Sequence, residues 1–123
     1  MNDVNYQIGE ILEGENNSPR DGNHYIVFFE KLDGCDFVGA MISTSSYRGR
    51  NLPMSVEHFE THNPDFIEWI VSYRGSYLVP AKLHKFNGMG PFHKVGQLTQ
   101  TGIEFLIKAI GKRPLHPWEF YKN

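Results

Sequence analysis

Most of the chain consists of short apolar or alternating apolar and polar segments that are separated by polar stretches, a pattern typical of β-strands. The stretch from Tyr6 to Leu12 alternates with a period of two residues, which predicts a first strand. The stretch from Tyr25 to Phe29 is continuously apolar and predicts a strand buried on both faces. Asp33-Gly34 separates it from the apolar stretch Phe37 to Ile42, so these two runs predict an antiparallel hairpin.

Further strands are predicted after this hairpin. The β-branched and aromatic residues of Phe66 to Tyr73 predict a strand that turns at Arg74-Gly75-Ser76 into a second one, from Ser76 to Phe86. Pro80 is expected at an edge or a bulge of that strand because proline has no N–H to donate. A last short strand is predicted from Phe92 to Leu98.

One helix is predicted, from about Gly102 to Ile110. Thr101 and Glu104 fit a capping box at its start, and Gly111 followed by Pro114 is a helix stop. Its apolar residues recur at the spacing of one helix face: Ile103, Leu106, Ile107 and Ile110.

Length and composition fit this pattern of short elements. The 123 residues are enough for one domain with a hydrophobic core, so residues 1–123 are interpreted as a single domain. Aromatic residues make up 14% of the chain, which favours β structure. We therefore predict a mainly β fold with a C-terminal α-helix: about six short strands in a strongly bent sheet or small barrel.

Charge and cysteine content narrow the functional classes. The net charge of −2 offers no global attraction to nucleic acid, so a nucleic-acid partner requires a local basic patch. Cys35 is the one cysteine, which favours a reducing compartment. We see neither a secretory leader nor a membrane-length apolar run, and so expect a cytoplasmic protein without a membrane partner.

The end of the predicted third strand carries an unusual run of hydroxyl residues. Arg48 and Arg50 follow it closely and supply the positive charge that phosphate contacts require. The open alternative is that the hydroxyls cap a turn and the arginines are solvated. The four hydroxyl residues are Ser43, Thr44, Ser45 and Ser46.

The polar loop before the second strand holds candidates for proton transfer. If the loop from Glu13 to Asn23 folds over the hydroxyl run, then Arg20, His24, Thr44 and Ser45 face one cleft. A histidine titrates near neutral pH and can act as a general acid or base. Alternatively, His24 is an ordinary residue at the start of a strand. This constellation requires no metal or cofactor.

Several motifs together resemble the MazF/PemK-type toxins, of which this chain looks like a divergent member. They are GEI in the first strand, a loop with proline and arginine, the run HYIVFF, a strand ending in ISTSS, and SYLVPAKLHKF followed by HKVGQLTQTGIEFL. The best part of the match is the element KVGQLT, from Lys94 to Thr99, because of its order and spacing relative to the stretch from Ser76 to Phe86. The resemblance spans most of the chain.

The resemblance implies an SH3-like small barrel that acts as a metal-independent endoribonuclease on single-stranded RNA. It further implies a homodimer and neutralisation by an antitoxin peptide. The resemblance implies a catalytic arginine in the first long loop, here Arg20, and phosphate-holding hydroxyls at the strand end, here Thr44 and Ser45. Combined with the chemistry of the residues themselves, this predicts Arg20, His24, Thr44 and Ser45 as catalytic and Ser43, Ser46, Arg48 and Arg50 as substrate-binding. This chain departs from the family pattern in the order Pro19-Arg20, and His24 stands where the family places Arg-Pro.

Three alternatives stay open. In the first alternative, the barrel is a non-catalytic module that binds peptide or nucleic acid or takes part in an assembly. The motif HFETH places His58 and His62 four residues apart, a spacing that on a helix suits a metal, although Asn63-Pro64 follows directly. In the third alternative, RNA binds to a stripe of basic residues or stacks on a set of aromatic residues. The stripe is Lys82, His84, Lys85, Lys94 and Arg113, and the aromatics are Tyr47, Trp69, Tyr73 and Tyr77.

Overall fold

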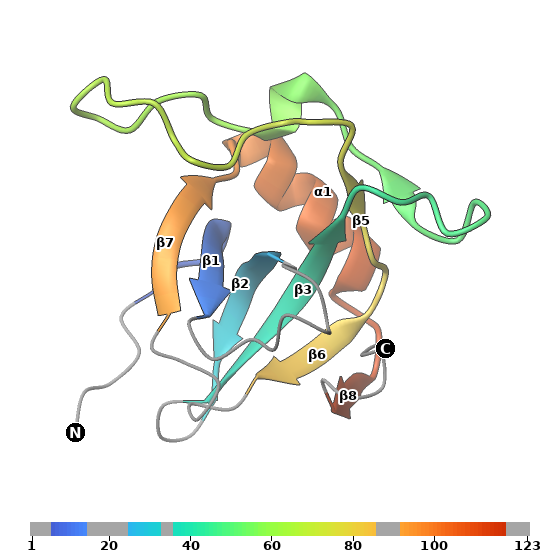
Figure 1. Cartoon of the computed structure of the whole chain (residues 1–123). Helices are drawn as coiled ribbons and strands as arrows, with labels where there is room; N and C mark the ends of the chain where they lie inside the picture. Colours follow the sequence, from blue (N-terminus) through green and yellow to red (C-terminus); the bar gives the residue numbers. More distant parts are fainter. Residues whose placement is uncertain (1–5, 15–24, 33–35, 86–91, 118–123) are drawn as a thin grey trace.

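The computed structural model of the chain describes residues 6–14, 25–32, 36–85 and 92–117. Within them the strands are β1 (Glu10–Gly14), β2 (Tyr25–Lys31), β3 (Phe37–Ser43), β4 (Leu52–Pro53), β5 (Tyr77–Leu78), β6 (Lys82–Lys85), β7 (Phe92–Gln97) and β8 (Leu115–Pro117). The helical elements are the 3₁₀ turn η2 (Val56–His58) and the helix α1 (Gln100–Ile110) (Figure 1). The predicted mainly β fold with one C-terminal helix is confirmed.

The strands form one sheet around the long central strand β3. The order along the sheet is β4-β5-β3-β2-β1-β7, while β6 pairs with both β3 and β8. All pairs are antiparallel except β6–β8, which is parallel. The sheet thus has eight strands in the described residues, not about six, because short strands at β4 and β8 join it.

Each face of the sheet buries its own apolar cluster. Successive residues of a strand point to opposite faces, so Ile11 and Val27 join one cluster while Leu12 and Ile26 join the other. The helix α1 packs on the first cluster through Leu106 and completes that half of the core. The continuously apolar sequences of β2 and β3 follow from this burial on both faces.

The first predicted hairpin is confirmed as β2 and β3. Tyr25 pairs with Ile42 and Lys31 pairs with Phe37 at the two ends of the ladder. The register shifts between Phe28 and Glu30, which marks a bulge in β2. The predicted turn at Asp33-Gly34 and the neighbouring Cys35 lie outside the described residues.

The first strand begins later than the sequence pattern predicts. Gly9 has a φ of 93°, which is not an extended conformation. The strand therefore cannot run through Gly9 and begins at the next residue, Glu10. The predicted strand from Tyr6 is therefore wrong in its first half, and β1 runs from Glu10 to Gly14.

The strand predicted from Phe66 to Tyr73 is wrong. Its residues form an irregular segment, because Asn63 accepts hydrogen bonds on its side-chain oxygen from the backbone N–H groups of Asp65 and Ile67. Such a turn curls the chain and competes with a sheet ladder. The predicted second hairpin is therefore absent from the described residues.

The stretch from Ser76 to Phe86 is divided, which the prediction of one strand did not anticipate. It forms β5 and β6 with Pro80 between them, and both strands pair with the same edge of β3. Pro80 thus lies at the break itself rather than inside a strand. The predicted last strand is confirmed as β7.

The predicted helix is confirmed as α1, but its N-cap is Thr99 and not Thr101. The Thr99 hydroxyl accepts a hydrogen bond from the backbone N–H of Gly102 at 3.1 Å. Leu106 and Ile110 are fully buried, whereas Ile107 is 48% exposed, so the buried face is narrower than the apolar stripe. Gly111 is the C-cap, as predicted.

Candidate functional site

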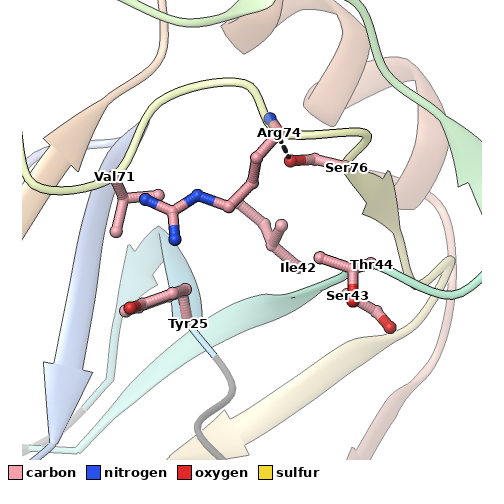
Figure 2. A pocket seen from close by; sticks show the side chains of 7 residues that line it. All are labelled: Tyr25, Ile42, Ser43, Thr44, Val71, Arg74 and Ser76. Atoms are coloured by element: carbon pink, nitrogen blue, oxygen red, sulfur yellow. Dashed lines mark hydrogen bonds between the residues drawn. The ribbon is translucent and has the colours of Figure 1, made fainter.

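A pocket of about 270 Å³ lies at the end of β3 (Figure 2). Strand pairing brings its walls together, because Tyr25 of β2 pairs with Ile42 and Ser43 pairs with Tyr77 of β5. The segment that leads into β5 therefore runs beside the hydroxyl end of β3. The lining residues are Tyr25, Ile42, Ser43, Thr44, Val71, Arg74 and Ser76.

Arg74 is the cation of this pocket, and the sequence analysis did not select it. Its Nη2 donates a hydrogen bond to the carbonyl of Ile70 at 2.8 Å. The turn that presents it has Gly75 at a φ of 68° and a hydrogen bond from the Arg74 backbone N–H to the Ser76 hydroxyl at 3.3 Å (Figure 2). Figure 2 shows the guanidinium extended across the pocket toward Tyr25.

The charge of this pocket is positive within the described residues. Arg74 is exposed, no described carboxylate pairs with it, and none of the seven lining residues is acidic. A guanidinium has five N–H donors, so it keeps donors for an anion after binding one carbonyl. Arginine and hydroxyl donors in one concave site are suited to the oxygens of a phosphate or carboxylate.

The predicted hydroxyl run divides into two roles. Ser43 and Thr44 line the pocket. Ser45 instead accepts a hydrogen bond on its hydroxyl from the backbone N–H of Tyr47 at 3.0 Å. Ser43 also accepts one from the backbone N–H of Ser45 at 3.0 Å, so the turn-capping alternative describes Ser43 and Ser45 correctly. The hydroxyl O–H of Ser43 can still act as a donor.

The predicted arginines lie away from the pocket walls. Arg48 and Arg50 are exposed on the loop between β3 and β4, together with Ser46, whose carbonyl accepts hydrogen bonds inside the loop. The guanidinium of Arg50 lies over the Tyr47 ring, 5.6 Å from its centroid. Arg20 and His24 fall outside the described residues, so their predicted roles stay predictions. The described chain enters β2 at Tyr25, the residue after His24.

The loop between β3 and β4 holds two non-glycine residues in a left-handed conformation. Tyr47 has a φ of 48° and Arg48 a φ of 57°, and the N–H of Gly49 bonds to the carbonyl of Ser46 at 3.0 Å. These φ values match a type I′ turn, where asparagine and glycine are preferred. Each such residue costs roughly 1–2 kcal/mol. The buried side chain of Asn51 steadies the loop by donating to the carbonyl of Ser45 at 2.9 Å.

The HFETH motif does not place its histidines on one helix face. The turn η2 ends at His58, whose Nδ1 accepts a hydrogen bond from the backbone N–H of Ser55 at 3.0 Å. The same ring is buried against Phe105, with 4.5 Å between ring centroids. His62 lies beyond the turn, where its Nδ1 is 2.8 Å from the Thr61 hydroxyl. In the described residues no group of three or more histidines, cysteines or carboxylates is placed to hold a metal.

The candidate basic stripe makes contacts within the fold. Its described side chains bind carbonyls or carboxylates of neighbouring elements, and the side chain of Lys85 lies outside the description. The contacts are Lys82 to the Gly111 carbonyl (3.0 Å), His84 to Asp36 (3.1 Å), Lys94 to Glu10 (3.2 Å) and Arg113 to the Ala109 carbonyl (3.1 Å).

The candidate aromatics differ in exposure. Tyr47 is 58% exposed, whereas Tyr73 is 39% exposed and packs near Phe59. Trp69 is partly buried under the ammonium of Lys94, 5.1 Å from the ring centroid. Tyr47 is therefore the most accessible of these rings for a ligand that stacks.

Comparisons with known proteins identify no relative. No family model, curated protein or solved structure matches the chain. The likeness to MazF/PemK-type toxins therefore rests on the sequence motifs alone. Among the described helices, none has the length and apolar content to span a membrane.

Proposed function

We propose that the chain binds single-stranded RNA at the pocket on the end of β3 and cleaves it there. The observation that carries this proposal is that Ser43, Thr44 and Arg74 line one pocket, which no described carboxylate lines. A pocket of about 270 Å³ is slightly smaller than the roughly 300–1,000 Å³ of ligand sites, and it suits a phosphate with part of its sugar. The apolar walls at Ile42 and Val71 give the sugar a surface to contact.

The proposed chemistry is attack of a ribose 2′-hydroxyl on the adjacent phosphorus. The 2′-oxygen forms a bond to phosphorus, the bond from phosphorus to the 5′-oxygen breaks, and the product ends in a 2′,3′-cyclic phosphate. The proton leaves the 2′-hydroxyl and another is delivered to the 5′-oxygen. Arg74 and Thr44 stabilise the negative charge that develops on the phosphate oxygens.

Proton transfer is proposed for Arg20, as the resemblance implies, and for His24, because an imidazole titrates near neutral pH. The observation that supports His24 is its place in the sequence directly before Tyr25, which lines the pocket. His24→Ala and Arg20→Ala are expected to lower the cleavage rate and leave RNA binding largely unchanged. A cleavage rate equal to that of the wild type in both variants would contradict these roles.

The resemblance also implies an SH3-like barrel, a homodimer and an antitoxin peptide, and we retain these as parts of the proposal. The strand ladders form an open sheet in the described residues, with β4 and β7 at the two ends of the order. Support for curvature toward a barrel comes from the isolated bridge between Phe59 and Leu98, which joins the segment after η2 to the end of β7.

The decisive test is cleavage of a labelled single-stranded RNA by purified protein in EDTA, with detection of the cyclic phosphate end. Arg74→Ala is expected to lower the rate by about 100-fold or more. Arg74→Lys should recover little, because a point charge does not replace the planar fork. The matched control is Lys108→Ala, which removes an exposed cation of α1 that belongs to none of the candidate RNA-binding sets. No cleavage by the wild type, or full activity in Arg74→Ala, would overturn the proposal.

A second candidate function is RNA binding without cleavage. The observation that favours it is that no described lining residue is a histidine, aspartate or glutamate, the common general bases. In that case RNA binds and depends on Arg74, but no cyclic phosphate product forms.

A further inference from the structure

The loop from Thr44 to Asn51, here called the Tyr47 loop, continues directly from the pocket wall. Figure 1 shows it leaving the end of β3 and projecting beyond the sheet before β4. Tyr47 follows Thr44 by three residues, so their backbones lie at most about 11 Å apart. A nucleotide chain with one phosphate in the pocket therefore has its neighbouring nucleotide within reach of this loop.

The sequence of the Tyr47 loop is not the one that its backbone favours. Tyr47 and Arg48 occupy the two left-handed positions where asparagine and glycine fit without strain. Hydrogen bonds to Ser45, Ser46 and Asn51 hold the loop in this conformation. Residues kept in a strained conformation with exposed side chains point to a role for those side chains.

The side chains themselves are those of a stacking site. Tyr47 is 58% exposed, and no described aromatic ring packs against it. Arg50 covers the ring at 5.6 Å from its centroid. An aromatic ring with neighbouring arginines is the combination by which single-strand binding proteins hold a base and its phosphates.

We propose that Tyr47 forms a nucleobase subsite beside the phosphate pocket. The base next to the phosphate that Arg74 holds stacks on the Tyr47 ring, Arg50 supports the ring, and Arg48 contacts the flanking phosphate. This inference rests on the proposed function, since it takes the pocket as an RNA phosphate site.

The charges of the two exposed segments favour the Tyr47 loop over the irregular segment from Asn63 to Ile70 as the site for a nucleotide. The irregular segment from Asn63 to Ile70 is also exposed and holds Phe66, which is 88% exposed. Its charged residues, Asp65 and Glu68, are however acidic, so they repel a phosphate backbone. The Tyr47 loop has Arg48 and Arg50 and no acidic residue.

The test is binding of a short, fluorescently labelled single-stranded RNA with 2′-O-methyl riboses, which cannot be cleaved, measured by fluorescence anisotropy. Tyr47→Asn removes the ring but suits the positive φ, so poor folding would not account for weak binding. It is expected to weaken binding by about 10-fold, whereas Tyr47→Phe keeps the wild-type affinity. Arg48→Ala should reduce the slope of log affinity against log salt by about 0.7, and Lys108→Ala, at an exposed position of α1, should leave the slope unchanged.

A second arm separates stacking from other effects of the ring. The same RNA with a single abasic position should bind the wild type as weakly as intact RNA binds Tyr47→Asn, and the variant should lose no further affinity on it. Unchanged affinity in Tyr47→Asn, with binding still dependent on Arg74, overturns the subsite but leaves the proposed function intact. No RNA binding by the wild type overturns both.

Discussion

The hydroxyl of Thr99 donates a hydrogen bond to the backbone carbonyl of Glu57, with 2.7 Å between the two oxygens. The same hydroxyl accepts from the backbone N–H of Gly102 at 3.1 Å. One side chain therefore caps α1 and ties it to η2, two elements that are far apart in the sequence. The backbone N–H of Thr99 also bonds to the carbonyl of His58 at 2.9 Å, which strengthens this junction.

The first prediction follows from this double role. Thr99→Ala is expected to lower the free energy of unfolding by about 1–2 kcal/mol, because it removes the N-cap and the link to η2. The measurement is urea denaturation followed by tryptophan fluorescence. Thr101→Ala is the matched control, since Thr101 is exposed within the first turn of the helix. An equal loss of stability in both variants would contradict the assignment of Thr99 as the cap.

The second prediction concerns the close approach of α1 to η2. A Cβ atom at Gly102 would overlap the backbone carbonyl of His58, which belongs to η2 and has little freedom to move. Gly102→Ala is therefore expected to destabilise the fold by about 1–3 kcal/mol, although alanine is the better helix former. Thermal unfolding compares it with Lys108→Ala, an exposed position of the same helix. A rise in the melting temperature of Gly102→Ala would show that the two elements can separate freely.

The parts of the fold that depend on local pattern were predictable. The hairpin of β2 and β3 follows from two apolar runs around a turn, and α1 follows from a helical stripe with a glycine stop. The stretch from Phe66 to Tyr73 has equally strong apolar content, but Ile67 and Ile70 are 62% and 70% exposed. Composition alone does not distinguish an apolar residue that packs in a sheet from one that faces solvent.

Only one part of the candidate site, the hydroxyl end of β3, could be predicted from the sequence. The hydroxyl end of β3 could be located because Ser43 and Thr44 follow a strand that the apolar pattern defines. Arg74 could not, because its place beside them depends on the pairing of Ser43 with Tyr77, which no local pattern encodes. The signal that was present is an arginine in a glycine turn directly before a strand.

The third prediction concerns pH. Burial raises the pKa of the Tyr6 phenol above its ordinary value of 10.0, with the carboxylate of Glu10 as the smaller cause. The folded protein therefore holds this proton more tightly than the unfolded chain does. The resulting stability is fully present below the unfolded pKa and is lost as the pH rises through the folded pKa.

Tyr6→Phe is the variant that checks this. At about pH 8 it should be less stable than the wild type, because the Tyr6 hydroxyl donates to the carbonyl of Phe92 at 2.8 Å. The difference should shrink as the pH rises above about 10, because the unfolded chain releases the Tyr6 proton there while the folded protein still holds it. Urea denaturation at several pH values measures it. A difference that stays constant to about pH 11 would contradict the raised pKa.

The fourth prediction sets stability against binding in the Tyr47 loop. The double variant Tyr47→Asn with Arg48→Gly places residues suited to positive φ at both left-handed positions. It should raise the free energy of unfolding by about 1–2 kcal/mol, because it relieves backbone strain at both positions while the conformational entropy of the new glycine in the unfolded chain cancels part of that gain. If the nucleobase subsite is correct, the same variant should bind single-stranded RNA about 10-fold more weakly or worse. Urea denaturation measures stability and fluorescence anisotropy measures affinity on the same preparation, with Lys108→Ala as the control for loss of a positive charge. A lower stability of the double variant would contradict the backbone strain in the loop. An unchanged affinity for RNA would contradict the role of the loop in binding.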